Sequence, residues 1–107
     1  SKLFGENLGK LYSERFGLRF LAARIGWLTA EDDPGLMRGT KAADYMRAIH
    51  LSHRDWVHFS RRALESDFGR FFVAYVTSDN TRNVYDLTET RRVLGYEPQD
   101  NAEPAFA

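Results

Sequence analysis

Residues 18–27 read LRFLAARIGW, and this stretch decides the fold class. Its centre, from Phe20 to Ala23, is continuously apolar, whereas a strand with one wet face would alternate apolar and polar side chains. A continuous apolar run is typical of a strand covered on both faces, and such strands usually belong to parallel sheets. A second buried strand is predicted within 70–78 (RFFVAYVTS), which is rich in aromatic and β-branched residues.

An amphipathic helix is predicted before the first strand, over residues 2–16. Gly17 follows it at the position of a left-handed C-terminal cap. Gly5 and Gly9 lie on one face of this helix, where a bare surface would let another backbone approach closely; simple tolerance is the alternative. The apolar positions at helical spacing are Phe4, Leu8, Leu11 and Tyr12.

The clearest helix signal follows a short extended segment at 48–52 (AIHLS). Ser52 suits an N-cap, and Asp55, three positions later, comes close to completing a capping box. The helix is expected to run to about Glu65. Its apolar face is expected to contain Trp56, Phe59, Ala63 and Leu64.

The other segments are shorter or less defined. Residues 29–35 contain acids, Pro and Gly and are predicted to form an exposed loop, and no element is assigned to 36–47. A short helix is expected over 86–94, with Asp86 as its cap and Gly95 as its end. Residues 98–107 are expected to form a flexible tail.

The resulting order is helix, strand, loop, short strand, helix, strand, helix. It predicts an α/β fold in which helices cover a small, mostly parallel sheet, within residues 1–107 as one domain or part of one. Two or three strands alone leave exposed edges, which further sheet or a second copy of the chain would ordinarily cover.

Composition limits the function. The chain is 43% hydrophobic and has 15 basic and 15 acidic residues, so no net field favours nucleic acid. It has no cysteine, which removes disulfides and thiol chemistry. No apolar run approaches the roughly 20 residues of a membrane span, and nothing resembles a signal peptide. Cytoplasmic location and no membrane partner are therefore expected.

Three segments resemble the carboxy-terminal half of the extended short-chain dehydrogenases, the NAD-dependent epimerase/dehydratase family. They are SKLFGENLGKLYSERFGLRFLAARIG at 1–26, LSHRDW at 51–56 and YDLTETRRVLGYEPQDNAE at 85–103. Within this family the likeness is greatest to uronate dehydrogenases and related sugar oxidoreductases. The resemblance implies an incomplete Rossmann-type layer that is part of a larger NAD-binding enzyme.

The resemblance assigns a catalytic role to Lys2. It matches the lysine of the YxxxK motif, whose tyrosine would precede Ser1, and it would also bind the nicotinamide ribose. Four positions on a helix put both side chains on one face, where the ammonium can lower the phenol pKa. From residue type alone, Lys2 is an ordinary solvated lysine.

Further site residues follow by position in the family. Ile25 would border the cofactor, Trp27 would contact the substrate, and Arg47 would grip the carboxylate of a sugar acid. Core packing is an alternative for Trp27, and a solvated helix position is an alternative for Arg47. Which sugar is used, and whether NAD or NADP, stays open.

Other chemistries are disfavoured. His53 and His58 do not share a helix face and His50 lies on an extended segment, so no metal site is expected. Ser52, His53 and Asp55 are too close in sequence to converge as a triad. No glycine-rich phosphate-binding turn occurs, so the isolated chain is expected to bind no dinucleotide.

Two functions of different class remain. The first is the substrate-side half of an NAD(P)-dependent sugar oxidoreductase, inactive alone, with a small sugar as substrate and a homodimer contact through the first helix. The second is a non-catalytic module derived from such an enzyme, which self-associates through that helix.

Overall fold

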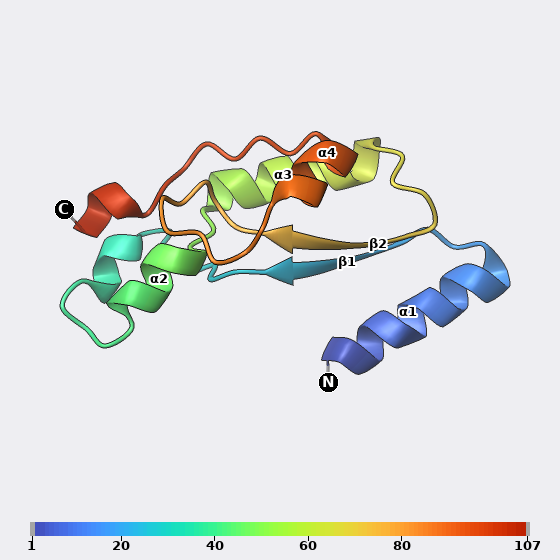
Figure 1. The fold of residues 1–107 in the computed structure, drawn as a ribbon, viewed down its shortest axis with the longest axis horizontal. Coiled ribbons are helices and arrows are strands. Elements are labelled where there is room, and N and C mark those ends of the chain that lie inside the picture. Colours follow the sequence, from blue (N-terminus) through green and yellow to red (C-terminus); the bar gives the residue numbers. More distant parts are fainter. Residues whose placement is uncertain (1, 107) are drawn as a thin grey trace.

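The computed structural model describes residues 2–106, in which two parallel strands lie between helices (Figure 1). β1 (Phe20–Ile25) pairs with β2 (Phe71–Val76) along the whole length of both. Parallel neighbours need a long crossover connection, and here it contains α2 (Ala43–Ile49) and α3 (His53–Glu65). The small parallel sheet with covering helices is therefore confirmed.

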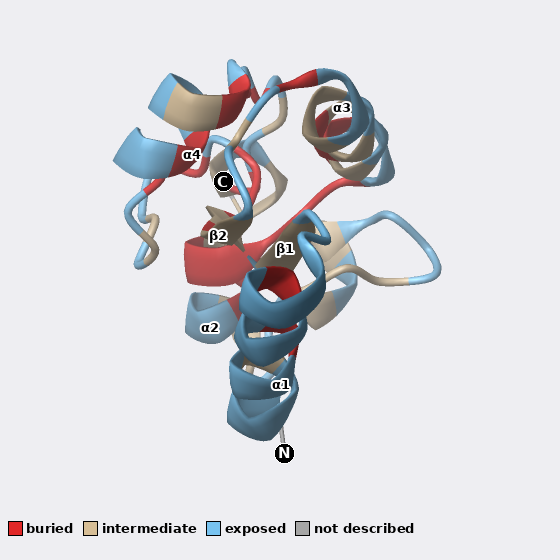
Figure 2. Cartoon of the chain, turned by 90° about the vertical axis from the view of Figure 1, so that its right-hand side faces the viewer, coloured by how far each residue is buried: buried red, intermediate tan, exposed pale blue. Residues whose placement is uncertain are grey.

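The molecule has three layers (Figure 2). α1 (Lys2–Phe16) lies on one face of the sheet, and α3 and α4 (Thr88–Leu94) lie on the other. The hydrophobic core fills the space between the sheet and α3 and α4. Its buried members are Leu51, Phe59, Ala74, Val76, Leu87, Leu94 and Tyr96.

α1 has the predicted bounds, but its apolar side chains do not pack on the sheet. Phe4 is 67% exposed and Phe16 is 64% exposed, so the apolar stripe faces outward. The residues that α1 buries are Gly9 and Ser13, and the Ser13 hydroxyl donates to the Arg70 carbonyl (2.9 Å). The helix therefore approaches the sheet through its small side chains.

The two glycines of α1 are not equivalent. A Cβ on Gly9 would lie 2.3 Å from ring atoms of Phe20, so the bare surface of Gly9 is used inside the chain and not by a partner. A Cβ on Gly5 would meet nothing within 4 Å. At Gly9 the close approach is therefore made by the Phe20 ring of the same chain and not by another backbone.

α3 begins as predicted, with the Ser52 hydroxyl accepting the Asp55 amide (3.1 Å). Two expectations fail. Leu64 is 85% exposed and does not belong to the apolar face. The Asp55 carboxylate completes no capping box, because it is fully buried and accepts the backbone amides of Gln99 (2.7 Å) and Asp100 (3.0 Å).

The same contacts argue against a flexible tail at 98–107, of which residue 107 lies outside the described residues. Beyond the two amides held by Asp55, Ala102 is fully buried and its amide donates to the Asn80 side chain (3.0 Å). A 3₁₀ turn, η2 (Glu103–Phe106), follows. The tail thus lies against α3 and the turn after β2.

The less defined segments differ from expectation. The loop at 29–35 ends in a 3₁₀ turn, η1 (Pro34–Met37), and the unassigned stretch holds most of α2. α2 also contains the first two residues of the expected extended segment at 48–52. Within that segment, His50 forms a β-bridge with Trp27.

The last helix begins later than predicted. Asp86 lies before α4, and its carboxylate accepts both the amide (2.9 Å) and the hydroxyl (2.6 Å) of Thr88. Leu87 therefore holds the N-cap position. Gly95 ends the helix in the left-handed conformation, as expected (φ 70°).

The chain at 50–51, directly after α2, separates the chain after β1 from the chain after β2. The Trp27 amide donates to Ile49 (2.7 Å), and the Ser78 amide donates to the carbonyl of His50 (2.8 Å). The His50 side chain is only 3% exposed, and its Nδ1 has no hydrogen-bond partner among the described residues. Burial lowers the pKa of His50, although the Asp32 carboxylate opposes the shift.

No helix within residues 2–106 has both the length and the apolar character that crossing a membrane requires.

Alanine substitutions at the two glycines of α1 should separate the effect of helix propensity on stability from the effect of packing against the sheet. We expect Gly5→Ala to stabilise the chain by up to about 1 kcal/mol, since it gains helix propensity in open space. Gly9→Ala should instead destabilise it by about 1–3 kcal/mol, the usual cost of overpacking, because its Cβ meets Phe20. Urea unfolding measures both, and a Phe20→Leu background should reduce the difference. Equal effects at the two positions would contradict the described approach of α1.

His50 should make stability depend on pH. A histidine with a lowered pKa in the folded chain binds its proton more readily when unfolded, so its contribution is present above the ordinary pKa of 6.5 and is lost as the pH falls below it. We expect the unfolding free energy of the unaltered chain to fall more steeply between about pH 7.5 and 5 than that of His50→Leu. Parallel curves for the two proteins would contradict a lowered pKa of His50 in the folded chain.

Candidate functional site

A cavity of about 700 Å³ lies between α1 and the sheet. The first turn of α1 lies below the carboxyl-terminal half of the strands, which is where ligands of α/β sheets usually bind (Figure 1). Polar, aromatic and apolar side chains from α1, from both strands and from the chain after β2 border the cavity. They include Lys2, Glu6, Arg24, Ile25, Tyr75 and Tyr85.

The structure brings two of the predicted site residues to this cavity. Lys2 is exposed in the first turn of α1, and among the described residues its ammonium forms no hydrogen bond or ion pair. Ile25 ends β1 and is 40% exposed. A free ammonium and an apolar side chain thus border the same space, from the helix and from the strand end.

Arg24 and Glu6 join α1 to β1 beside Lys2. The guanidinium of Arg24 donates to both carboxylate oxygens of Glu6 (2.9 and 2.8 Å) and to the hydroxyl of Tyr75 (2.7 Å). The hydrogen bonds from Arg24 hold the pKa of Glu6 below its usual range. The sequence offered no signal for this pair, because the helical period places Glu6 on α1 without showing what that face meets.

Trp27 and Arg47 are not among the described residues that line the cavity. The Trp27 ring lies 5.9 Å from that of Tyr45, and the Trp27 backbone forms the bridge to His50. On α2, Arg47 pairs with the exposed Asp44. These two predicted substrate contacts therefore do not line the cavity that Lys2 and Ile25 border.

Arg47 nevertheless has donor capacity to spare. Its guanidinium carbon lies 5.2 Å from the centre of the Phe106 ring. Its Nε is buried and has no hydrogen-bond partner within residues 2–106. An arginine that lies against a ring and has a donor without a partner is able to donate a hydrogen bond to an anionic oxygen.

The histidine and serine candidates serve as structural contacts. Within the described part of the chain no three His, Asp or Glu side chains are grouped to hold a metal ion. The Ser52 hydroxyl donates to Asp100 (2.6 Å), and Nε2 of His53 lies 2.5 Å from the Thr29 carbonyl oxygen. With Asp55 turned toward the tail, these side chains form no relay.

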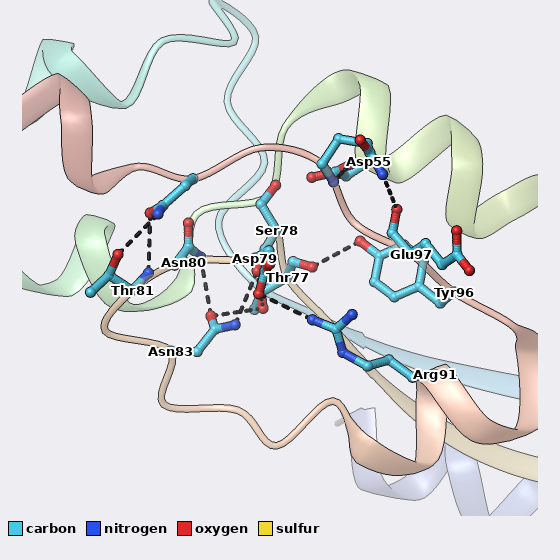
Figure 3. A network of polar contacts seen from close by, with 12 residues as sticks. Asp55, Thr77, Ser78, Asp79, Asn80, Thr81, Asn83, Arg91, Tyr96 and Glu97 are labelled. Carbon is cyan, nitrogen blue, oxygen red and sulfur yellow. Dashed lines mark hydrogen bonds and ion pairs between the residues drawn. The ribbon is translucent and has the colours of Figure 1, made fainter.

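A polar network fixes the turn after β2 (Figure 3). The hydroxyl of the buried Tyr96 donates to the Thr77 carbonyl (2.8 Å), and the side chain of Asn83 accepts from Thr77 (2.9 Å) and Asn80 (3.1 Å). Burial raises the pKa of Tyr96 far above that of a free phenol. These groups satisfy one another and lie outside the cavity lining, so we assign them to the framework.

No protein-family model matches the chain. Among curated proteins it is 40% identical over 105 residues to L-arabinose 1-dehydrogenase (NAD(P)(+)) of Haloferax volcanii, a match that covers 95% of this chain and 41% of that protein. It is 36% identical over 102 residues to the NAD-dependent glucose-6-phosphate dehydrogenase of the same organism, covering 95% of this chain and 36% of the relative.

Among solved structures the fold matches uronate dehydrogenase from Agrobacterium tumefaciens with a TM-score of 0.75 and 28% identity. The match covers 95% of this chain and 35% of that one. The chain spans well under half the length of each of these proteins. Nearly all of this chain is thus homologous to one part of the NAD(P)-dependent sugar dehydrogenases of the uronate dehydrogenase type.

Proposed function

We propose that the chain forms the substrate-side part of an NAD(P)-dependent oxidoreductase that acts on a sugar or sugar acid, and that it is inactive alone. The relatives are NAD(P)-dependent dehydrogenases of such substrates, and the chain covers only part of them. The observation that carries the proposal is the cavity at the strand ends, where Lys2 is exposed and unpaired among the described residues.

The cavity suits one end of a dinucleotide. The ammonium of Lys2 can donate to ribose hydroxyls, and Ile25 offers an apolar surface to a flat ring. The glycine-rich turn that binds a pyrophosphate is absent from the sequence, so those contacts require residues outside this chain. NAD or NADP, when bound, supplies the hydride acceptor.

In this proposal Lys2 lowers the pKa of a catalytic phenol on the same helix face, which lets the phenol remove a hydroxyl proton from the sugar. Arg47 selects acidic sugars, since its unfilled donor can meet a carboxylate. The Trp27 ring, tilted against that of Tyr45, forms an aromatic wall for the apolar face of the sugar ring.

A chimera tests the role of Lys2. We would join the amino-terminal part of the Haloferax volcanii L-arabinose 1-dehydrogenase, up to the position matching Lys2, to this chain. Sugar-dependent reduction of NAD or NADP, followed by absorbance, is expected. Lys2→Ala should lower kcat by about 10²–10⁴-fold, which is the factor that general acid–base catalysis usually contributes to a rate. Lys10→Ala, on the exposed part of the same helix, is the control and should change little. A chimera inactive on every sugar, or full activity of Lys2→Ala, would contradict the proposal.

The same chimera tests Arg47 with substrates that differ in charge. Arg47→Leu should lower kcat/KM for glucuronate by about 10-fold or more, the loss of one charged hydrogen bond. Its kcat/KM for L-arabinose, which has no carboxylate, should stay near that of the parent. Equal losses on both sugars would show that Arg47 is structural and not a carboxylate contact.

A second function, self-association through α1, is favoured by one observation. The outward face of α1 carries a groove of about 270 Å³ with apolar and aromatic walls. Large exposed apolar patches usually mark interaction surfaces. The groove is lined by Leu8, Leu11, Tyr12, Arg15 and Phe16. A second copy of the chain is the proposed occupant, because two such stripes would bury one another in an antiparallel helix pair.

Sedimentation of the 107-residue chain tests the contact. We expect the weight-average molar mass to rise with protein concentration toward that of a dimer. Leu11→Glu should abolish the rise, since it places a charge in the middle of the stripe. Leu64→Glu, at an 85% exposed position on α3, is the matched control and should dimerise normally. A strictly monomeric mass of the unaltered chain at all concentrations would refute the proposal.

A further inference from the structure

The arginine at the cavity is occupied by protein partners. Nε and Nη2 of Arg24 bind the two oxygens of Glu6, and Nη1 binds the Tyr75 hydroxyl. The guanidinium carbon also lies 5.3 Å from the centre of the Tyr75 ring. Because its fork is filled in this way, Arg24 is better suited to hold the site together than to grip a ligand.

This contact joins three elements at one point. Arg24 and Tyr75 are directly opposite one another in the parallel ladder, so the strands supply a firm base for the guanidinium. Glu6 lies on α1, one helical turn after Lys2. The described ties of Gly9 and Ser13 to the sheet lie further along the helix, so the Arg24–Glu6 pair is the one next to Lys2.

We propose that Arg24 is a positioning residue for Lys2, which it holds at the cavity by clamping Glu6 one turn away. The clamp also keeps the Glu6 carboxylate from pairing with the Lys2 ammonium, which a free glutamate four positions away on a helix could do. This inference rests on the proposed function, in which Lys2 acts in catalysis.

Kinetics of the chimera test the catalytic consequence. Arg24→Ala and Glu6→Gln should each lower kcat by about 10- to 100-fold, as a displacement near 1 Å of a catalytic group does. The double variant should lose no more than either single one, because the two side chains act as a unit. Arg24→Lys keeps the charge but lacks the fork and should recover part of the loss.

Rates are compared after correction for the folded fraction, measured by circular dichroism. The control is Arg92→Ala, which breaks an exposed ion pair with Glu89 on α4, far from the cavity lining. Near-normal kcat in Arg24→Ala, or losses that add in the double variant, would overturn the proposal. Glu6→Gln is close in shape to the original and keeps the test valid if Arg24→Ala does not fold.

A spectroscopic measurement on the 107-residue chain tests the clamp without any activity. The chain has no cysteine, so spin labels can be placed at Leu3→Cys on α1 and Leu64→Cys on α3, both exposed positions. Labelled chain diluted in unlabelled chain should give one narrow distance distribution. Arg24→Ala and Glu6→Gln should broaden it, and Arg92→Ala should not.

The two experiments separate the possible failures. An unchanged distribution in Arg24→Ala, or one already broad in the unaltered chain, overturns the clamp whatever the chimera does. A narrow distribution that broadens in the variants, together with an inactive chimera, supports the clamp and refutes the proposed function.

Discussion

The parallel pairing of β1 with β2 is the constraint on which the rest of the structure depends. Successive side chains of a strand point to opposite faces, so this ladder presents Leu21 and Ala23 to α3 and α4, and Phe20 and Arg24 to α1. A two-stranded sheet has little stability of its own and must be covered on both faces. The two covers are built differently: a closed apolar core lies on one face, and small or charged contacts lie on the other.

That difference between the two covers explains why the cavity lies between α1 and the sheet and not on the other face. On the other face, large side chains such as Phe59 and Leu94 fill the space against the strands. α1 instead meets the sheet through Gly9 and Ser13 and turns its large apolar side chains outward. In its first turns, a directional polar contact joins Glu6 to Arg24 of β1. Hydrogen bonds fix orientation more closely than apolar contacts do, which suits the proposed role of this helix in presenting the Lys2 ammonium.

Local signals in the sequence predicted the parts of the fold that depend on neighbouring residues. The apolar run at Phe20–Ala23, the cap at Ser52 and the left-handed glycine at Gly95 each need only a few residues to act, and each lies where it was expected. Contacts between distant residues were not predictable in this way. The helical period of α1 defined an apolar stripe but not the direction it faces, and Asp55 was taken for a cap when its partners lie 44 and 45 positions further on. For the same reason, the expectation that Lys2 and Ile25 border one site came from the resemblance to a family and not from periodicity.

The buried and exposed polar contacts have different tasks. Asp55 is closed from water and accepts two backbone amides, so its loss would leave both amides without this partner and release the tail from α3. The Arg24–Glu6 pair is only partly covered, with 41% of the Arg24 side chain and 14% of the Glu6 side chain exposed, and an ion pair near the surface adds little to global stability. A contact that contributes little stability but fixes the geometry of a helix end can change the position of Lys2 without unfolding the core. In the proposed function, the residues that hold the fold are thus different from those that position the site.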